Sequence, residues 1–203
     1  MNKVDNFIEI ISKIESTESF ENIYWGNSNL SNIRKENLRN YLNEMLNFNS
    51  ELTLLLGEAP GYKGCKLTGI PFTSEYIIST NKFFLNKGYT IINLQKENTS
   101  TIIWQELSEK KPPLLWNIFP FHPFSLNKIN SNRTPYISEL NIGYEIFLEL
   151  YNIYNINKII TIGRKAEYIL KKNNIDCIYL RHPSNGGVSE FKNNFKKLII
   201  NKL

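Results

Sequence analysis

The chain has 203 residues, of which 41% are hydrophobic and 21% are charged, a composition that excludes a disordered tail and fits one domain. Its net charge of +5 is compatible with a polyanionic partner. Two cysteines, Cys65 and Cys177, are too few for a disulfide framework or a four-thiolate site. We therefore expect no metal or other cofactor and a reducing, cytoplasmic setting. No apolar stretch reaches the ~18 residues that cross a membrane, and the first residues do not resemble a signal peptide.

The first fifty residues, taken in chain order, predict helices. Apolar residues recur at helical spacing from Val4 to Ile14. A second helix is expected to begin at Ser31, a favourable N-cap, and to carry apolar residues on its inner face from Leu38 to Leu46.

From residue 50 onward, short apolar runs alternate with helical patterns. The runs are typical of buried parallel strands and cover residues 52–56, 114–118, 158–162 and 177–180. Helices are expected over residues 74–85, 164–172 and 189–203. This alternation predicts a single α/β domain over residues 1–203. We expect three α/β/α layers, with a central, largely parallel, four-stranded sheet and a helical segment at about 1–50.

The loops that follow the predicted strands are the expected ligand-binding region, because ligands bind at the carboxyl ends of parallel strands. The first loop contains several glycines, which let a backbone approach a ligand closely. The two histidines, His122 and His182, each follow a predicted strand and precede a proline. His182 is favoured as functional because small, hydrogen-bonding residues follow it. No carboxylate or second histidine lies at metal-ligand spacing.

Five short segments occur in one order along residues 50–200. They are GEAPG at 57–61, TGIPF at 68–72, Asn117, GRKA at 163–166 and RHPS at 181–184. This ordered set resembles the uracil-DNA glycosylase superfamily, in particular its family-four branch. Family-four enzymes carry four cluster-binding cysteines, and this chain has two, so we expect no iron–sulfur cluster.

The resemblance implies a monofunctional DNA N-glycosylase that flips a pyrimidine out of DNA and excises it. It implies two catalytic residues. His182 would donate to the base oxygen as that oxygen gains charge, and Glu58 would orient or deprotonate water, or stabilise the sugar cation. Phe72 would stack on the flipped base, and Asn117 would read its Watson–Crick edge. Each residue also has a structural interpretation. His182 would be a hydrogen-bonded structural residue and Glu58 a solvated loop acid. Phe72 would be a core ring, and Asn117 a turn residue or strand-end cap.

The remaining site residues follow from the same resemblance. The predicted base-binding residues are Gly57, Ala59, Gly61, Phe72 and Asn117. The predicted DNA-binding residues are Pro60, Tyr62, Lys63, Arg181, Ser184, Asn185, Gly186 and Gly187, and Lys66 is expected to add charge beside them. We expect DNA as the partner of a monomer that does not bind membranes.

The base itself is left open by the sequence. Uracil is the base that the resemblance implies. An asparagine amide can rotate to match cytosine, however, and Gly61 stands where uracil-specific enzymes place a tyrosine against carbon 5. A 5-hydroxymethylated or glucosylated cytosine of phage DNA is therefore an alternative substrate, which would make the protein an antiviral defence enzyme. Two further alternatives are a non-catalytic DNA-binding module and a generic nucleotide-binding domain.

Overall fold

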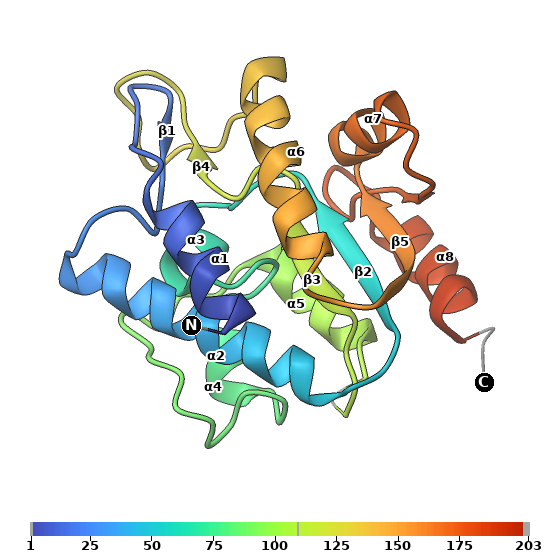
Figure 1. Cartoon of the computed structure of the whole chain (residues 1–203). Coiled ribbons are helices and arrows are strands. Elements are labelled where there is room, and N and C mark those ends of the chain that lie inside the picture. The colour runs from blue at the N-terminus through green and yellow to red at the C-terminus, as the bar shows by residue number, and fades with distance from the viewer. Residues whose placement is uncertain (1, 109, 201–203) are drawn as a thin grey trace.

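The computed structural model describes residues 2–108 and 110–200, and its centre is a four-stranded sheet. The strands lie in the order β3-β2-β5-β6, and every neighbouring pair is parallel. Their bounds are β2 (Leu52–Gly57), β3 (Leu114–Asn117), β5 (Ile156–Ile162) and β6 (Ile178–Leu180). The prediction of a parallel four-stranded sheet is confirmed, and all four carboxyl ends meet at one edge (Figure 1).

Helices cover both faces of this sheet and complete the three predicted layers (Figure 1). One face carries α1 (Lys3–Ser12), α6 (Ile137–Tyr151) and α7 (Arg164–Lys172). The other carries α5 (Asn98–Glu106) and α8 (Val188–Ile200). This division is the one that right-handed crossovers between parallel strands produce. None of the helices in the described ranges is long and apolar enough to span a bilayer.

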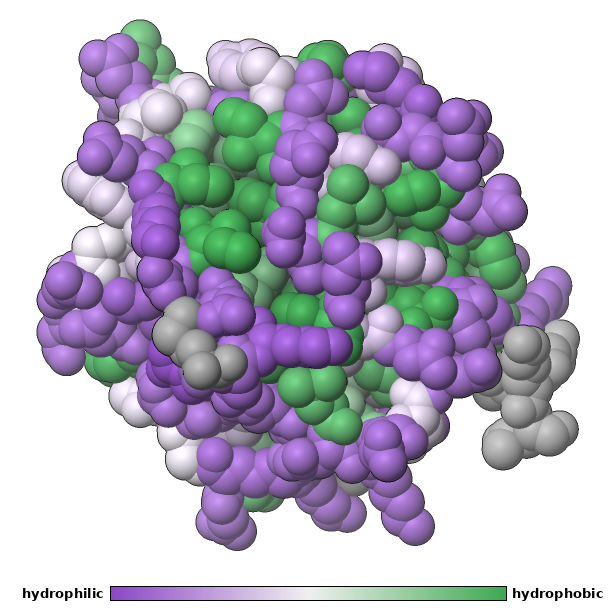
Figure 2. Space-filling model, in the orientation of Figure 1, coloured by the Kyte–Doolittle hydropathy of each residue, from purple (hydrophilic) through white to green (hydrophobic). Residues whose placement is uncertain are grey.

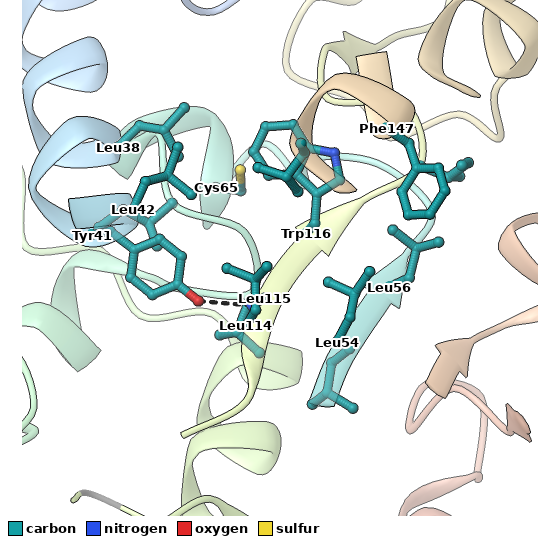
Figure 3. Packing of buried hydrophobic residues seen from close by; sticks show 14 of the residues in the cluster. Leu38, Tyr41, Leu42, Leu54, Leu56, Cys65, Leu114, Leu115, Trp116 and Phe147 are labelled. Carbon is teal, nitrogen blue, oxygen red and sulfur yellow. Dashed lines mark hydrogen bonds between the residues drawn. The ribbon is translucent and has the colours of Figure 1, made fainter. Parts of the chain in front are cut away.

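The core forms where the strands meet these helices (Figure 3). Leu54, Leu56, Trp116 and Phe147 are fully buried there, and each such side chain contributes about 1.5–3 kcal/mol by leaving water. The face seen in Figure 2 is mostly hydrophilic, with hydrophobic residues showing between the polar side chains. The apolar runs in the sequence therefore fold inward as the strand pattern indicates.

The N-terminal segment packs against the sheet and against the loop that follows β2. It contains α1, β1 (Phe20–Glu21) and α2 (Asn29–Asn47). The Tyr41 hydroxyl of α2 accepts a hydrogen bond from the Leu115 N–H at 2.7 Å (Figure 3). The first fifty residues, which contribute nothing to the motif resemblance, are thus bonded directly to strand β3 of the sheet.

A two-stranded antiparallel ribbon joins this segment to the middle of the chain. It pairs β1 with β4 (His122–Pro123), with Phe20 opposite Pro123 and Glu21 opposite His122. The sequence analysis did not predict it, because a two-residue strand shows no alternation.

Several predicted element bounds require correction. Helix α2 begins at Asn29 rather than Ser31, because the Ser28 side chain is the N-cap and accepts from the Ser31 N–H at 3.1 Å. The helix expected over 74–85 ends early, as α4 (Glu75–Thr80). Asn81 stops it, since its side chain accepts from the Phe83 N–H and so competes with the helical backbone bonds.

Other bounds differ by a residue or two, and some elements were missed. Strand β6 begins at Ile178, and α8 begins at Val188; of the residues expected in that last helix, 201–203 lie outside the described ranges. Helices α5, α6 and the short α3 (Cys65–Thr68) were not predicted.

Candidate active site

A pocket of about 680 Å³ opens at the carboxyl ends of the strands. It is lined by Asn117 at the end of β3 and by residues at or after the ends of β2, β5 and β6, which lie far apart in the sequence. The predicted site residues that line it are Glu58, Ala59, Pro60, Gly61, Phe72, Asn117, Arg181, His182, Ser184 and Asn185. The fold therefore brings together most of the residues that the motifs pointed to.

Gly57 lies where the ring of Phe72 meets the amide of Asn117. It ends β2 and pairs with Asn117 at the end of β3. A Cβ atom on Gly57 would lie 2.2 Å from Phe72 Cζ and 2.6 Å from Asn117 Oδ1. Only glycine fits at this position, and its missing side chain is what lets the ring and the amide lie side by side.

The Phe72 ring faces the pocket because of an unusual backbone conformation. Its φ of 55° is in the left-handed region, which is strained for a bulky side chain. Thr68 stabilises the surrounding turn by donating from its hydroxyl to the Thr73 carbonyl at 2.8 Å. Phe72 stays half-buried, unlike the core ring of Phe147. Strain of this kind is typical of a ligand site.

Asn117 offers its amide at the base of the same wall. The side chain is buried, and its Nδ2 lies 4.0 Å from Cys65 Sγ. Burial raises the pKa of the Cys65 thiol well above its usual value, so that group stays protonated. A thiol both donates and accepts hydrogen bonds, so Cys65 is compatible with either orientation of the amide.

Two glutamates line the pocket, Glu58 and Glu97. The Glu97 carboxylate accepts hydrogen bonds from the Thr99 and Ser100 backbone N–H groups, whereas Glu58 lies in the first motif. Burial raises the pKa of Glu58 above the usual value, and a hydrogen bond from Thr134 and the charge of Lys165 oppose that rise. Its backbone carbonyl accepts from the Phe119 N–H at 3.0 Å, which ties the loop after β2 to the end of β3. A carboxyl group with a raised pKa in a pocket is suited to proton transfer near neutral pH.

The hydrogen bonds of His182 determine which ring nitrogen carries its proton. Nδ1 accepts from the Ser184 backbone N–H at 3.1 Å and lies 2.7 Å from the Ser184 hydroxyl. Since a backbone N–H can only donate, the neutral ring carries its proton on Nε2. Burial lowers the pKa of His182 and so favours the neutral form. The ring thus presents an N–H donor to the pocket that it lines.

The 181–187 loop, between β6 and α8, holds His182 in a tight turn. Asn185 and Gly186 have positive φ angles of 52° and 77°. Gly187 is buried, and a Cβ atom there would lie 2.3 Å from the His182 carbonyl oxygen. Gly186 and Gly187 were predicted to bind phosphate. Gly187 instead packs against the His182 carbonyl, and neither glycine is among the lining residues of the pocket.

The 58–64 loop, between β2 and α3, forms another part of the pocket wall. The Tyr62 N–H donates to Asn132 Oδ1 at 3.0 Å, and Lys63 is exposed, with its ammonium 5.5 Å from the Tyr62 ring centroid. A Cβ atom on Gly61 would meet nothing nearer than the Asn132 amide, at 4.0 Å. The open space that the sequence predicted beside Gly61 is therefore bounded by Asn132.

Lys66 and His122 are both buried, which excludes each of them from contact with a ligand in the pocket. Lys66 is buried and forms an ion pair with Glu21 at 2.8 Å, so the prediction that it adds charge for phosphate is wrong. His122 is also fully buried, and carbonyl oxygens flank both of its ring nitrogens. It is therefore unable to replace His182 in the pocket.

The 124–136 loop, between β4 and α6, was not predicted to reach the site, and it supplies Asn132, Arg133 and Thr134 to the pocket. Arg133 is fixed by Glu139 at 2.8 Å and by the Ser19 carbonyl at 2.8 Å. The other unpredicted lining residues are Cys65, Glu97, Thr99, Ile162, Gly163, Arg164 and Tyr179. The polar run Asn132–Thr134 before Pro135 marks a loop, but nothing in that run indicates which pocket it reaches.

The described residues contain no cluster of three or more histidine, cysteine or acidic side chains that could hold a metal ion.

Comparison with known proteins gives a fold neighbour. No family model matches the sequence, and no curated protein matches it. The structure is similar to the crystal structure of wild-type SMUG2 from Pedobacter heparinus, with a TM-score of 0.69 and 20% sequence identity. The match covers 100% of this chain and 95% of that one. The two chains share one fold, and the N-terminal helical segment is part of it.

Proposed function

We propose that this protein is a monofunctional DNA N-glycosylase that flips a pyrimidine out of DNA and hydrolyses its glycosidic bond. The observation that carries the proposal is the convergence of Glu58, Phe72, Asn117 and His182 on one pocket. The shared fold supports it, because SMUG2 is a member of the uracil-DNA glycosylase superfamily. No lysine is among the described lining residues, which favours hydrolysis over Schiff-base chemistry.

Phe72 and Asn117 would bind the flipped base. Stacking on an aromatic ring is worth about 1–3 kcal/mol per base, and the half-buried Phe72 ring beside Gly57 offers one face for it. The Asn117 amide would then hydrogen-bond to the base edge, with one acceptor and two donors.

His182 and Glu58 would stabilise the two charges that develop as the bond breaks. The neutral His182 ring would donate from Nε2 to the base oxygen that gains negative charge. Removing such a donor typically costs about 2.7–4 kcal/mol. The Glu58 carboxylate would orient and deprotonate the attacking water, or stabilise the sugar cation.

The rim of the pocket would hold the DNA backbone. Its candidate contacts are Pro60, Tyr62, Lys63, Arg181, Ser184 and Asn185. Such phosphate contacts position the DNA without reading its sequence. We propose that the protein acts as a monomer in the cytoplasm.

Uracil is the proposed base, and one observation favours a second candidate. Because Gly61 leaves open space up to Asn132, and because Cys65 is compatible with both amide orientations of Asn117, a 5-modified cytosine is the alternative. Excision of a hydroxymethylated or glucosylated cytosine from phage DNA would be an antiviral defence. A non-catalytic DNA-binding module explains the pocket less well, since it needs neither Glu58 nor the Nε2 donor of His182.

The test is to incubate the protein with oligonucleotides that contain uracil, hypoxanthine, 5-hydroxymethylcytosine or its glucosylated form, and then to cleave abasic sites with alkali. Breaks at uracil are expected. Breaks only at a modified cytosine would favour the antiviral defence enzyme over the uracil glycosylase. If no substrate is cleaved, glycosylase activity is excluded and the non-catalytic DNA-binding module becomes the alternative. A gel-shift measurement on the same oligonucleotides would then detect DNA binding.

A further inference from the structure

His122 is a fully buried histidine to which the proposed chemistry gives no role. Its Nδ1 lies 2.8 Å from the Pro60 carbonyl oxygen and its Nε2 lies 3.0 Å from the Ile129 carbonyl oxygen. A carbonyl oxygen only accepts hydrogen bonds, so each contact requires an N–H on the ring. The neutral ring satisfies one of them, and the protonated ring satisfies both.

The two carbonyl groups belong to two different loops, each of which supplies residues to the pocket. Pro60 lies in the 58–64 loop. Ile129 lies in the 124–136 loop, which brings Asn132 and Thr134 to the pocket. A second hydrogen bond, from the Tyr62 N–H to Asn132 Oδ1, joins the same two loops. His122 is thus placed between the loop of Glu58 and the loop of Thr134.

The charges around His122 are held in a buried network. Lys66 of α3 also donates to the Ile129 carbonyl, at 3.0 Å, and pairs with Glu21 of β1. Arg34 of α2 pairs with the same Glu21 at 3.2 Å. Burial and the charge of Lys66 lower the pKa of His122, whereas the two carbonyl contacts and Glu21 oppose that shift. The second hydrogen bond of the ring is therefore made on the acid side of the ordinary histidine range.

We propose that His122 is a positioning residue, which clasps the 58–64 loop to the 124–136 loop and so holds Thr134 against Glu58. Its effect on catalysis rests on the proposed function, but its effect on the loops does not. Because the hydrogen bond from Thr134 lowers the pKa of Glu58, release of the 124–136 loop should raise that pKa further. The clasp therefore links a buried residue to the proton chemistry of the pocket.

Two isosteric variants separate the two contacts. In His122→Asn the amide nitrogen takes the place of Nδ1 and keeps the Pro60 contact. In His122→Gln it takes the place of Nε2 and keeps the Ile129 contact. Below the pKa of His122, where the protonated wild-type ring makes both contacts, amide hydrogen exchange in the 124–136 loop should accelerate several-fold, up to about tenfold, in both variants, as expected for one lost hydrogen bond. Exchange in β2 should stay at the wild-type rate.

The wild-type protein provides an independent test, because it contains no substitution that could disturb folding. Protection of the 124–136 loop, corrected for intrinsic exchange, should decrease as the pH rises through the pKa of His122, since one hydrogen bond is lost there. The other charged groups of this network are Lys66, Arg34 and Glu21, which form ion pairs with one another.

Activity on the best oligonucleotide provides the catalytic readout. Both variants should lower kcat more than they raise KM, and the acid limb of the rate profile should move to higher pH. Wild-type loop exchange in both variants, or acceleration spread equally over the whole chain, would overturn the clasp. If the wild type cleaves no oligonucleotide, the proposed function fails, and the exchange measurements still decide the clasp.

Discussion

The two His-Pro segments, 122–123 and 182–183, have similar sequences and opposite environments. His182 has a backbone N–H against Nδ1, which fixes Nε2 as its donor, and it lines the pocket. His122 has carbonyl oxygens against both nitrogens and is sealed in the core. The comparison teaches that the partners of a histidine, rather than its sequence neighbours, determine whether it acts on a ligand or holds loops together.

The largest effect is expected for His182→Ala. Loss of the Nε2 donor should lower kcat by about 10²–10³, the range measured for single donors to a developing oxyanion. DNA binding should change little, because the rim residues remain. Single-turnover cleavage and fluorescence anisotropy on the same oligonucleotide measure the two quantities. A fully active variant would contradict the assignment of His182.

Glu58→Gln should have the next largest effect, a loss of about 10² in kcat. Because burial raises the pKa of Glu58, its carboxylate is lost as the pH falls through that raised pKa. The wild-type rate should therefore decline at a higher pH than an ordinary glutamate would give. Burial lowers the pKa of His182, which favours the neutral ring. If the decline of the rate at low pH persists unchanged in Glu58→Gln, a group other than Glu58 causes that decline.

Gly57→Ala should weaken base binding by about tenfold or more. The new methyl group would meet the Phe72 ring and the Asn117 amide, and displacement of the ring forfeits much of a stacking energy of about 1–3 kcal/mol. Gly61→Ala is the matched control, since its methyl group enters open space. Equal KM values for the two variants would contradict the assignment of Gly57, Phe72 and Asn117 to the base-binding wall.

Lys63 and Lys66 form a second pair of similar residues, one exposed and one buried. Their substitution should have the smallest effects of the variants considered. Lys63→Met should weaken DNA binding a few-fold and reduce the salt dependence by about one unit of slope, with the melting temperature unchanged. Lys66→Met should instead lower the melting temperature, because it removes a buried partner of Glu21. Reversed outcomes would show that the buried and exposed lysines are wrongly assigned.

The central sheet was predictable because apolar runs such as Leu52–Leu56 end at turn residues. The ordered motifs pointed to Phe72, Asn117 and His182, and the structure places all three in the wall of one pocket. Thr134 was not predictable, because its approach to Glu58 depends on the fold of the 124–136 loop. Lys66 was misjudged for a similar reason, since its partner Glu21 lies in an unpredicted two-residue strand. Such pairings depend on tertiary contacts that no local pattern encodes.

Release of a free base from DNA tests the central claim most directly. Wild-type protein, His182→Ala and His122→Gln would each be incubated with uracil-containing and 5-modified-cytosine DNA, and the released bases separated by chromatography. The account predicts release by the wild type, strongly reduced release by His182→Ala and partial release by His122→Gln. Release by His182→Ala at the wild-type rate, or no release by the wild type from any substrate, would contradict it.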